Sequence, residues 1–108
     1  MTAQSNRQHY RIFYPDGSRP GLRMEGAEYP LLDLSEEGLR FSAVDSESVP
    51  VGTSIAGNIM FRRGETVAVS GRVVRVSGGV VAAQLDRKIP LGAILEEHLW
   101  LARAFPTE

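Results

Sequence analysis

Glycine and proline interrupt this sequence every several residues, and they constrain its fold more than any other feature. The interruptions stand at Pro15, Gly17, Pro20, Gly21, Gly26, Pro30, Gly38, Pro50, Gly52, Gly64, Gly78, Gly79 and Pro90. The segments between them are too short for long helices, but they fit short strands joined by turns. The spacing therefore predicts a small antiparallel β structure over most of the chain.

The apolar pattern between these interruptions predicts six strands. They cover residues 11–14, 27–34, 38–43, 54–62, 66–77 and 80–85. Pro30 predicts an edge position or a bulge in the second strand, because proline donates no ladder hydrogen bond. In the fifth strand the valines change phase on either side of Gly71, which predicts a bulge there. The Gly78-Gly79 pair has the composition of a hairpin turn.

The last segment of the chain has a different pattern. Leucine, alanine and glutamate favour a helix over about residues 91–105, and Pro106 ends it. The apolar residues near helical spacing are Ile94, Leu95, Leu99, Ala102 and Phe105. One helix after about six strands predicts a β-barrel, or a strongly bent sheet, with the helix packed on it.

Composition excludes several classes of function. The chain has 108 residues, which is one domain's worth, and 43% of them are hydrophobic, as in an ordinary globular core. It has no cysteine, so disulfides and thiol catalysis are excluded. His9 and His98 stand far apart in the sequence, so we expect no metal site. No apolar run reaches the roughly 18 residues of a membrane span, and we expect a cytoplasmic protein because no apolar signal segment begins the chain.

Charge also argues against a nucleic-acid binder. The formal net charge is −1, whereas proteins that bind polyanions are usually strongly basic. Within the chain, residues 1–23 carry four arginines against one aspartate, and residues 24–47 carry seven acidic residues against one arginine. Eleven of the twelve basic residues are arginine, whose planar fork of donors suits phosphates and guanine edges.

The first motif with chemical content is Arg7-x-x-x-Arg11. It lies just before the first predicted strand, and we expect residues 1–10 to form a flexible arm, because termini are loose unless they are tied down. Two arginines four residues apart can address one anionic ligand if this segment makes a turn. Taken alone, the pair is more typical of two solvated surface arginines.

The second motif is Asp33-x-Ser35-x-x-Gly38, between two predicted strands. Aspartate and serine can hydrogen-bond to nearby backbone amides and hold a tight turn, and a glycine permits a positive φ or the close approach of another group. Considered without the first motif, this segment is explained more simply as a plain β-turn. Glu36 and Glu37 are expected to be solvated, because no nucleophile, general acid or metal set accompanies them, and we expect no enzymatic activity.

Together, the two motifs resemble those of the PilZ domain family. The resemblance extends from Arg7 to the C-terminal helix and includes residues 38–41 and 71–76. PilZ domains are bacterial receptors for the second messenger cyclic di-GMP. The resemblance implies a mainly β fold, a six-stranded antiparallel β-barrel formed by residues 11–108, with a C-terminal helix packed on it.

The resemblance also implies a ligand site. Arg7 and Arg11 would bind the phosphates and the O6/N7 edge of guanine, and Asp33 would accept hydrogen bonds from guanine N–H groups. Ser35 would contact the base or ribose edge, and Gly38 would let the ligand approach closely. Three further residues are possible secondary contacts: Asn6, Tyr10 and Arg40.

The implied role is that of a receptor and adaptor, with cyclic di-GMP as ligand and no cofactor. The ligand would order the arm across the barrel and change the surface presented to an unidentified effector protein. Asn6 stands where some relatives carry another arginine, so one or two ligands per chain remain open. The alternative is a nucleotide-independent protein-interaction module of the same fold. Trp100, Leu101 and Phe105 would then be partner anchors, or else the helix face that packs on the barrel.

Overall fold

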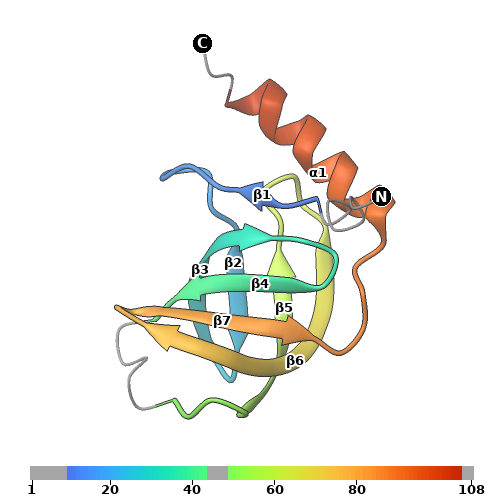
Figure 1. Ribbon diagram of the computed structural model, residues 1–108. Coiled ribbons are helices and arrows are strands. Elements are labelled where there is room, and N and C mark those ends of the chain that lie inside the picture. Colours follow the sequence, from blue (N-terminus) through green and yellow to red (C-terminus); the bar gives the residue numbers. More distant parts are fainter. Residues whose placement is uncertain (1–9, 44–48, 106–108) are drawn as a thin grey trace, which may run out of the picture.

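The computed structural model describes residues 10–43 and 49–105 and shows seven strands followed by one helix (Figure 1). The elements are β1 (Ile12–Phe13), β2 (Gly21–Met24), β3 (Ala27–Leu34), β4 (Gly38–Ser42), β5 (Ser54–Met60), β6 (Thr66–Ser77), β7 (Val80–Leu85) and α1 (Leu91–Ala104). All the strand pairings are antiparallel. The Gly78-Gly79 turn joins β6 to β7 as predicted, with φ angles of +57° and +82°.

Strands β2 to β7 form a closed barrel. The sheet order is β1-β3-β2-β5-β6-β7-β4, and an additional pairing of β3 with β4 closes the ring. Strand β1 stays outside this ring and pairs only with the end of β3. The predicted six-stranded barrel is therefore confirmed, with β1 as an extra strand.

One barrel strand was missed by the sequence analysis. Residues 11–14 were expected to supply one of the six strands, but β2 takes that place in the ring. Strand β2 is short, directly follows Pro20 and has only Leu22 fully buried. Its apolar pattern is therefore too brief to be distinguished from a loop.

The predicted irregularity in β3 is a bulge and not an edge. Strand β3 pairs with neighbours on both sides, and its register against β4 shifts between Leu31 and Asp33. The irregularity thus follows Pro30 closely. Because of the inserted residue, Leu31 and Leu34 both belong to the core although they are three positions apart. Asp33 consequently faces the outer side of the barrel.

The predicted bulge in β6 lies at a different residue. The register against β7 shifts between Val73 and Arg75, so the inserted residue is Val74 and not a neighbour of Gly71. Val73 is buried, Val74 and Arg75 are both exposed, and Val76 again packs against the core. The change of phase was read correctly from the valines, but its position was wrong.

Gly71 is required for a different reason, the close approach of β6 and β7. A Cβ atom added there would lie 2.1 Å from the backbone oxygen of Gln84. We expect Gly71→Ala to lower the free energy of unfolding by about 1–3 kcal/mol, because backbone atoms must move apart. The control is Gly92→Ala in α1, where an added Cβ meets no atom within 4 Å. Urea unfolding should show a loss only for Gly71→Ala, and equal stability of the two variants would contradict this account.

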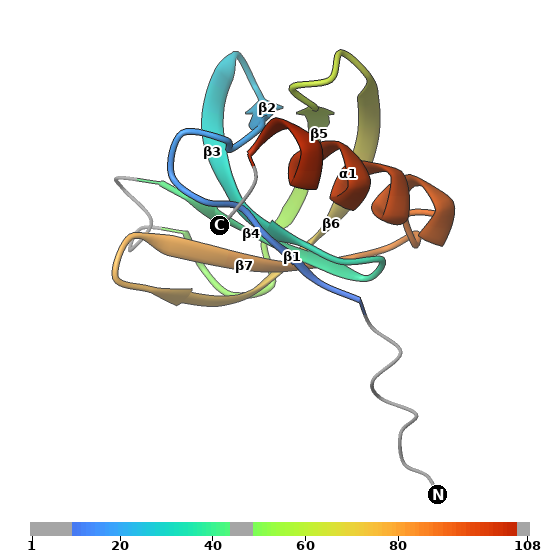
Figure 2. The ribbon, with the colours of Figure 1, turned by 90° about the horizontal axis from the view of Figure 1, so that it is seen from above.

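Helix α1 lies across one end of the barrel (Figures 1 and 2). Its buried residues are Ile94, Glu97 and Leu101. The expected packing face was partly wrong, since Leu95 and Leu99 are 43% and 56% exposed. The apolar pattern pointed to these leucines because they stand near helical spacing, whereas the helix buries Glu97 with Ile94 and Leu101.

The buried glutamate of α1 is held by two hydrogen bonds from the barrel side. The Tyr14 hydroxyl donates to one oxygen of Glu97 at 2.7 Å, and Arg63 Nε donates to the other at 2.9 Å. Burial, followed by the hydrogen bond to Glu97, raises the pKa of Tyr14 above its ordinary value. This Tyr14–Glu97–Arg63 network therefore joins α1 to the segment after β1 and to the β5–β6 turn.

Candidate functional site

The Asp33-x-Ser35-x-x-Gly38 segment forms the tight turn from β3 to β4. The Ser35 N–H donates to the Gly38 carbonyl oxygen at 2.8 Å. The Ser35 hydroxyl oxygen accepts the Gly38 N–H at 3.1 Å and the Glu37 N–H at 3.4 Å. The turn that the motif predicts is thus present, and the buried serine side chain holds it.

Gly38 is required by close approach. An added Cβ would lie 3.1 Å from the Ala83 carbonyl oxygen and 3.8 Å from Arg11 Nη2. Gly38 is not among the glycines with positive φ, so of the two roles considered for it, backbone freedom does not apply. Its missing side chain keeps the surface open between β4 and the Arg11 guanidinium.

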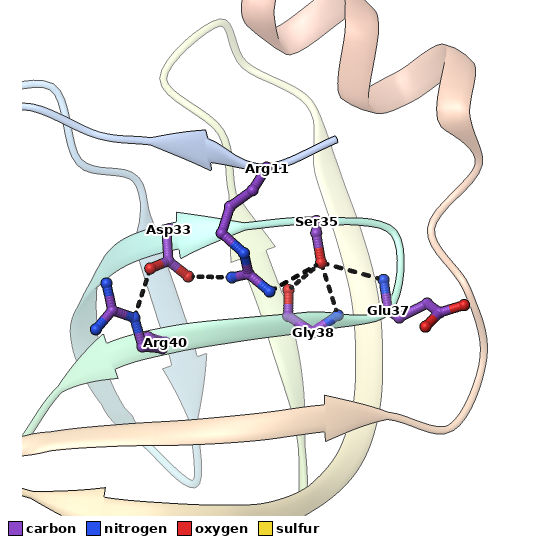
Figure 3. A network of polar contacts seen from close by, with 6 residues as sticks. All are labelled: Arg11, Asp33, Ser35, Glu37, Gly38 and Arg40. Carbon is purple, nitrogen blue, oxygen red and sulfur yellow. Dashed lines mark hydrogen bonds and ion pairs between the residues drawn. The ribbon is translucent and has the colours of Figure 1, made fainter. Parts of the chain in front are cut away.

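Arg11 reaches both polar residues of the second motif (Figure 3). Its Nη1 donates to Asp33 Oδ1 at 2.5 Å, and its Nη2 donates to the Ser35 hydroxyl at 3.3 Å. The first contact joins residues that are 22 positions apart in the sequence, and the second joins residues that are 24 positions apart. The fold therefore brings one arginine of the first motif onto the aspartate and serine of the second.

Arg40 completes this cluster from β4. Its Nε donates to Asp33 Oδ2 at 2.5 Å, so both carboxylate oxygens are paired with arginine (Figure 3). The Asp33 side chain has no exposed surface, while the side chains of Arg11 and Arg40 are 37% and 46% exposed. Two guanidinium groups around one carboxylate leave a surplus of positive charge facing solvent. Such a surface favours an anion.

Strand register extends the cluster into a row across the outer face of the barrel. Phe13 of β1 lies opposite Asp33 of β3, and Asp33 lies opposite Arg40 of β4. Arg40 in turn lies opposite Ala82 of β7, which lies opposite Arg75 of β6. The row therefore brings together residues from five strands.

A hollow with a volume of about 620 Å³ lies over this row. Its lining residues are Arg11, Phe13, Asp33, Ser35, Glu37, Gly38, Leu39, Arg40, Val74, Ala82, Ala83 and Gln84. The lining includes every described residue of the two motifs that the sequence analysis assigned to the ligand. A second cavity of about 630 Å³ lies elsewhere, between the β2–β3 hairpin, β4 and β5, and contains none of them.

Several of these residues were missed by the sequence analysis. Phe13 was placed in a strand, and Val74 and Gln84 were given no role. In a strand, Phe13 lies on the opposite face from Ile12 and Tyr14, which are both buried. Because all three residues are apolar, the sequence did not show which face points outward. The neighbourhood of Val74 and Gln84 depends on strand pairing, which a local pattern does not reveal.

The other predicted residues have different outcomes. Tyr10 packs on α1, its ring centroid 5.3 Å from that of His98 in an edge-on arrangement. Trp100 packs against the core and against Phe105, which favours their role as a packing face. Asn6, Arg7 and all but the last residue of the predicted arm lie outside the described residues.

Two further features concern the parts of the chain that the structure describes. Over these residues, no helix is long and apolar enough to cross a membrane. Within the same ranges, no group of three or more histidine, cysteine, aspartate or glutamate side chains is placed to hold a metal ion.

Comparisons with known proteins identify the family and the fold. The family model of the PilZ domain matches residues 5–99. Among solved structures, the chain is similar to the Bacillus subtilis inhibitor of motility (MotI/DgrA), with a TM-score of 0.67 and 13% sequence identity. The match covers 96% of this chain and 53% of that protein, so the chain spans about half its length. No curated protein sequence gives a significant match.

Proposed function

The chain belongs to the PilZ domain family, and from this premise we propose that it is a receptor and adaptor for cyclic di-GMP without catalytic activity. One observation carries the proposal. Arg11, Asp33 and Ser35 come from segments far apart in the sequence and form one hydrogen-bonded cluster on an open surface. A cluster serving the fold alone would not need two half-exposed guanidinium groups at a hollow.

Different residues of the site bind different parts of the ligand. Cyclic di-GMP carries two phosphodiester charges and two guanine bases. Arg11, together with Arg7 of the arm, binds phosphate oxygens and the O6/N7 edge of guanine, for which the guanidinium fork is well suited. Asp33 accepts from guanine N–H donors, Ser35 contacts the base or ribose edge, and Gly38 lets the ligand approach closely.

Binding requires an exchange of partners at Asp33. Its side chain is fully buried beneath two arginines, so guanine reaches the carboxylate only when one guanidinium moves. Among the described residues, Arg11 donates to both Asp33 and Ser35, whereas Arg40 donates to Asp33 only. Arg40 is therefore the side chain that moves away from Asp33 when guanine binds. Once released, its guanidinium group faces the ligand's phosphates.

The adaptor role follows from where the arm is attached. Binding through Arg7 and Arg11 orders residues 1–10 across the barrel, and the binding energy offsets the entropy of ordering. Tyr10, the last residue of the arm, contacts His98 of α1, so ordering the arm changes the surface beside this helix. The effector protein recognises that surface in one of its two states.

Isothermal titration of the chain with cyclic di-GMP tests the proposal, with GTP as the control nucleotide. We expect saturable binding of the cyclic dinucleotide and a ratio of one or two ligands per chain. GTP should bind far more weakly because it does not offer two guanines joined by phosphodiesters. Absence of heat and of a thermal shift at tens of micromolar ligand would contradict the receptor function.

A nucleotide-independent interaction module is the second candidate, and the outer side of α1 favours it. Leu91, Leu95 and Leu99 recur at intervals of four residues and are 45%, 43% and 56% exposed. Such a row is a suitable contact surface for another protein. This function predicts partner capture that is unchanged by cyclic di-GMP and is lost in Leu95→Glu.

A further inference from the structure

Phe13 is an exposed aromatic residue beside the buried aspartate of the site. Its side chain is 64% exposed, while its neighbours Ile12 and Tyr14 are 2% and 4% exposed. It lies directly opposite Asp33 in the β1–β3 pair, and side chains in such pairs have Cβ atoms about 4.5–5.5 Å apart. The core does not explain an outward phenylalanine at this position.

Two small residues and a second apolar side chain also line the hollow beside Phe13. Gly38 and Ala82 have little or no side chain, and both line the hollow. Val74, the inserted residue of the β6 bulge, also lines it and is 47% exposed. The hollow therefore combines apolar side chains, at Phe13 and Val74, with the polar cluster around Asp33.

We propose that Phe13 is a base-stacking residue for the guanine whose edge Asp33 reads, and that Val74 bounds the same base pocket. This inference rests on the proposed receptor function and adds to it a contact that neither motif contains. A nucleobase presents donors and acceptors at its edge and an apolar π surface on its faces. Asp33 can recognise only the edge of the base, whereas an aromatic ring beside it can cover one face of the base.

The arrangement also explains why an aromatic residue suits this position. The guanidinium groups of Arg11 and Arg40 attract phosphates, but they do little to exclude water from a bound base. A ring next to the carboxylate excludes water from the guanine–Asp33 contact, which strengthens the hydrogen bonds made there. Phe13 thus contributes affinity, while the carboxylate contributes the choice of base.

The test compares three variants by isothermal titration with cyclic di-GMP. Phe13→Ala should weaken binding between about fivefold and 150-fold, which is the range that the stacking of one base on an aromatic side chain typically contributes. Phe13→Leu keeps apolar volume without a ring and should lie between Phe13→Ala and the wild type. Val51→Ala is the matched control, because Val51 is 66% exposed, much like Phe13, and does not line the hollow.

Fluorescence gives a second readout that a merely structural role would not change. The chain has one tryptophan, so Phe13→Trp combined with Trp100→Phe places a single indole at the proposed platform. Cyclic di-GMP should quench its emission along the same saturation curve as the titration. Trp100→Phe alone, with no indole, sets the background.

The outcomes separate this inference from the receptor function. If the wild type binds and Arg11→Ala does not, while Phe13→Ala binds like the wild type, stacking on Phe13 is overturned and the receptor function stands. Unquenched emission from a binding-competent Phe13→Trp variant overturns it equally. If the wild type binds no cyclic di-GMP, the receptor function fails and this inference fails with it.

Discussion

Replacing Arg11 with alanine should weaken the binding of cyclic di-GMP at least tenfold and leave the barrel folded. In the proposed complex Arg11 makes charge-assisted hydrogen bonds to phosphate or guanine, each worth roughly 1.5–3 kcal/mol. Since 1.4 kcal/mol corresponds to a factor of ten in affinity, the loss of one such bond weakens binding about tenfold or more, and the loss of two weakens it about 100-fold or more. The fold should survive because Arg40 still pairs with Asp33.

Two further variants make this measurement specific. Arg11→Lys keeps the charge but removes the planar fork, so it should bind more weakly than the wild type and more tightly than Arg11→Ala. Arg23→Ala is the control, since Arg23 pairs with the half-exposed Glu28 and does not line the hollow. Arg7→Ala should act in the same direction as Arg11→Ala. Unchanged affinity in both the Arg7 and the Arg11 variants would remove the site assignment.

The largest effect on stability is expected at Arg63. Arg63→Met leaves the Glu97 carboxylate buried with only the Tyr14 hydroxyl as a partner. Removing one member of a buried ion pair typically costs about 3–5 kcal/mol, because the remaining charge is uncompensated. For a domain of this size, such a loss lowers the midpoint of thermal unfolding by more than about 10 °C.

A second substitution shows whether the uncompensated charge is the cause. In the Arg63→Met background, Glu97→Gln removes that charge while its amide oxygen still accepts from Tyr14, so part of the lost stability should return. Arg103→Met is the control, because Arg103 is exposed in the last turn of α1. A drop no larger for Arg63→Met than for Arg103→Met would show that the network does not hold the helix.

The strands were largely predictable because their patterns are local. Residues 27–34, 66–77 and 80–85 coincide with β3, β6 and β7, since alternation and turn residues act over a few positions. Strand β2 was not found because only one of its side chains is fully buried. The packing face of α1 was misjudged because the barrel supplies Tyr14 and Arg63 as partners for Glu97, and neither lies near it in the sequence.

In the candidate site, too, local features could be predicted and contacts between distant segments could not. The turn from Asp33 to Gly38 could be predicted from the sequence, since hydrogen bonds from backbone amides to a nearby serine hydroxyl are local. A family resemblance also assigned Arg11 and that turn to one ligand site, and the structure adds the direct hydrogen bonds of Arg11 to Asp33 and Ser35. The sequence did not predict that Phe13, Ala82 and Arg75 lie in one row with Asp33 and Arg40. Their neighbourhood follows from the register of five strands and from a bulge, and register is set by long-range pairing and packing that no local pattern encodes.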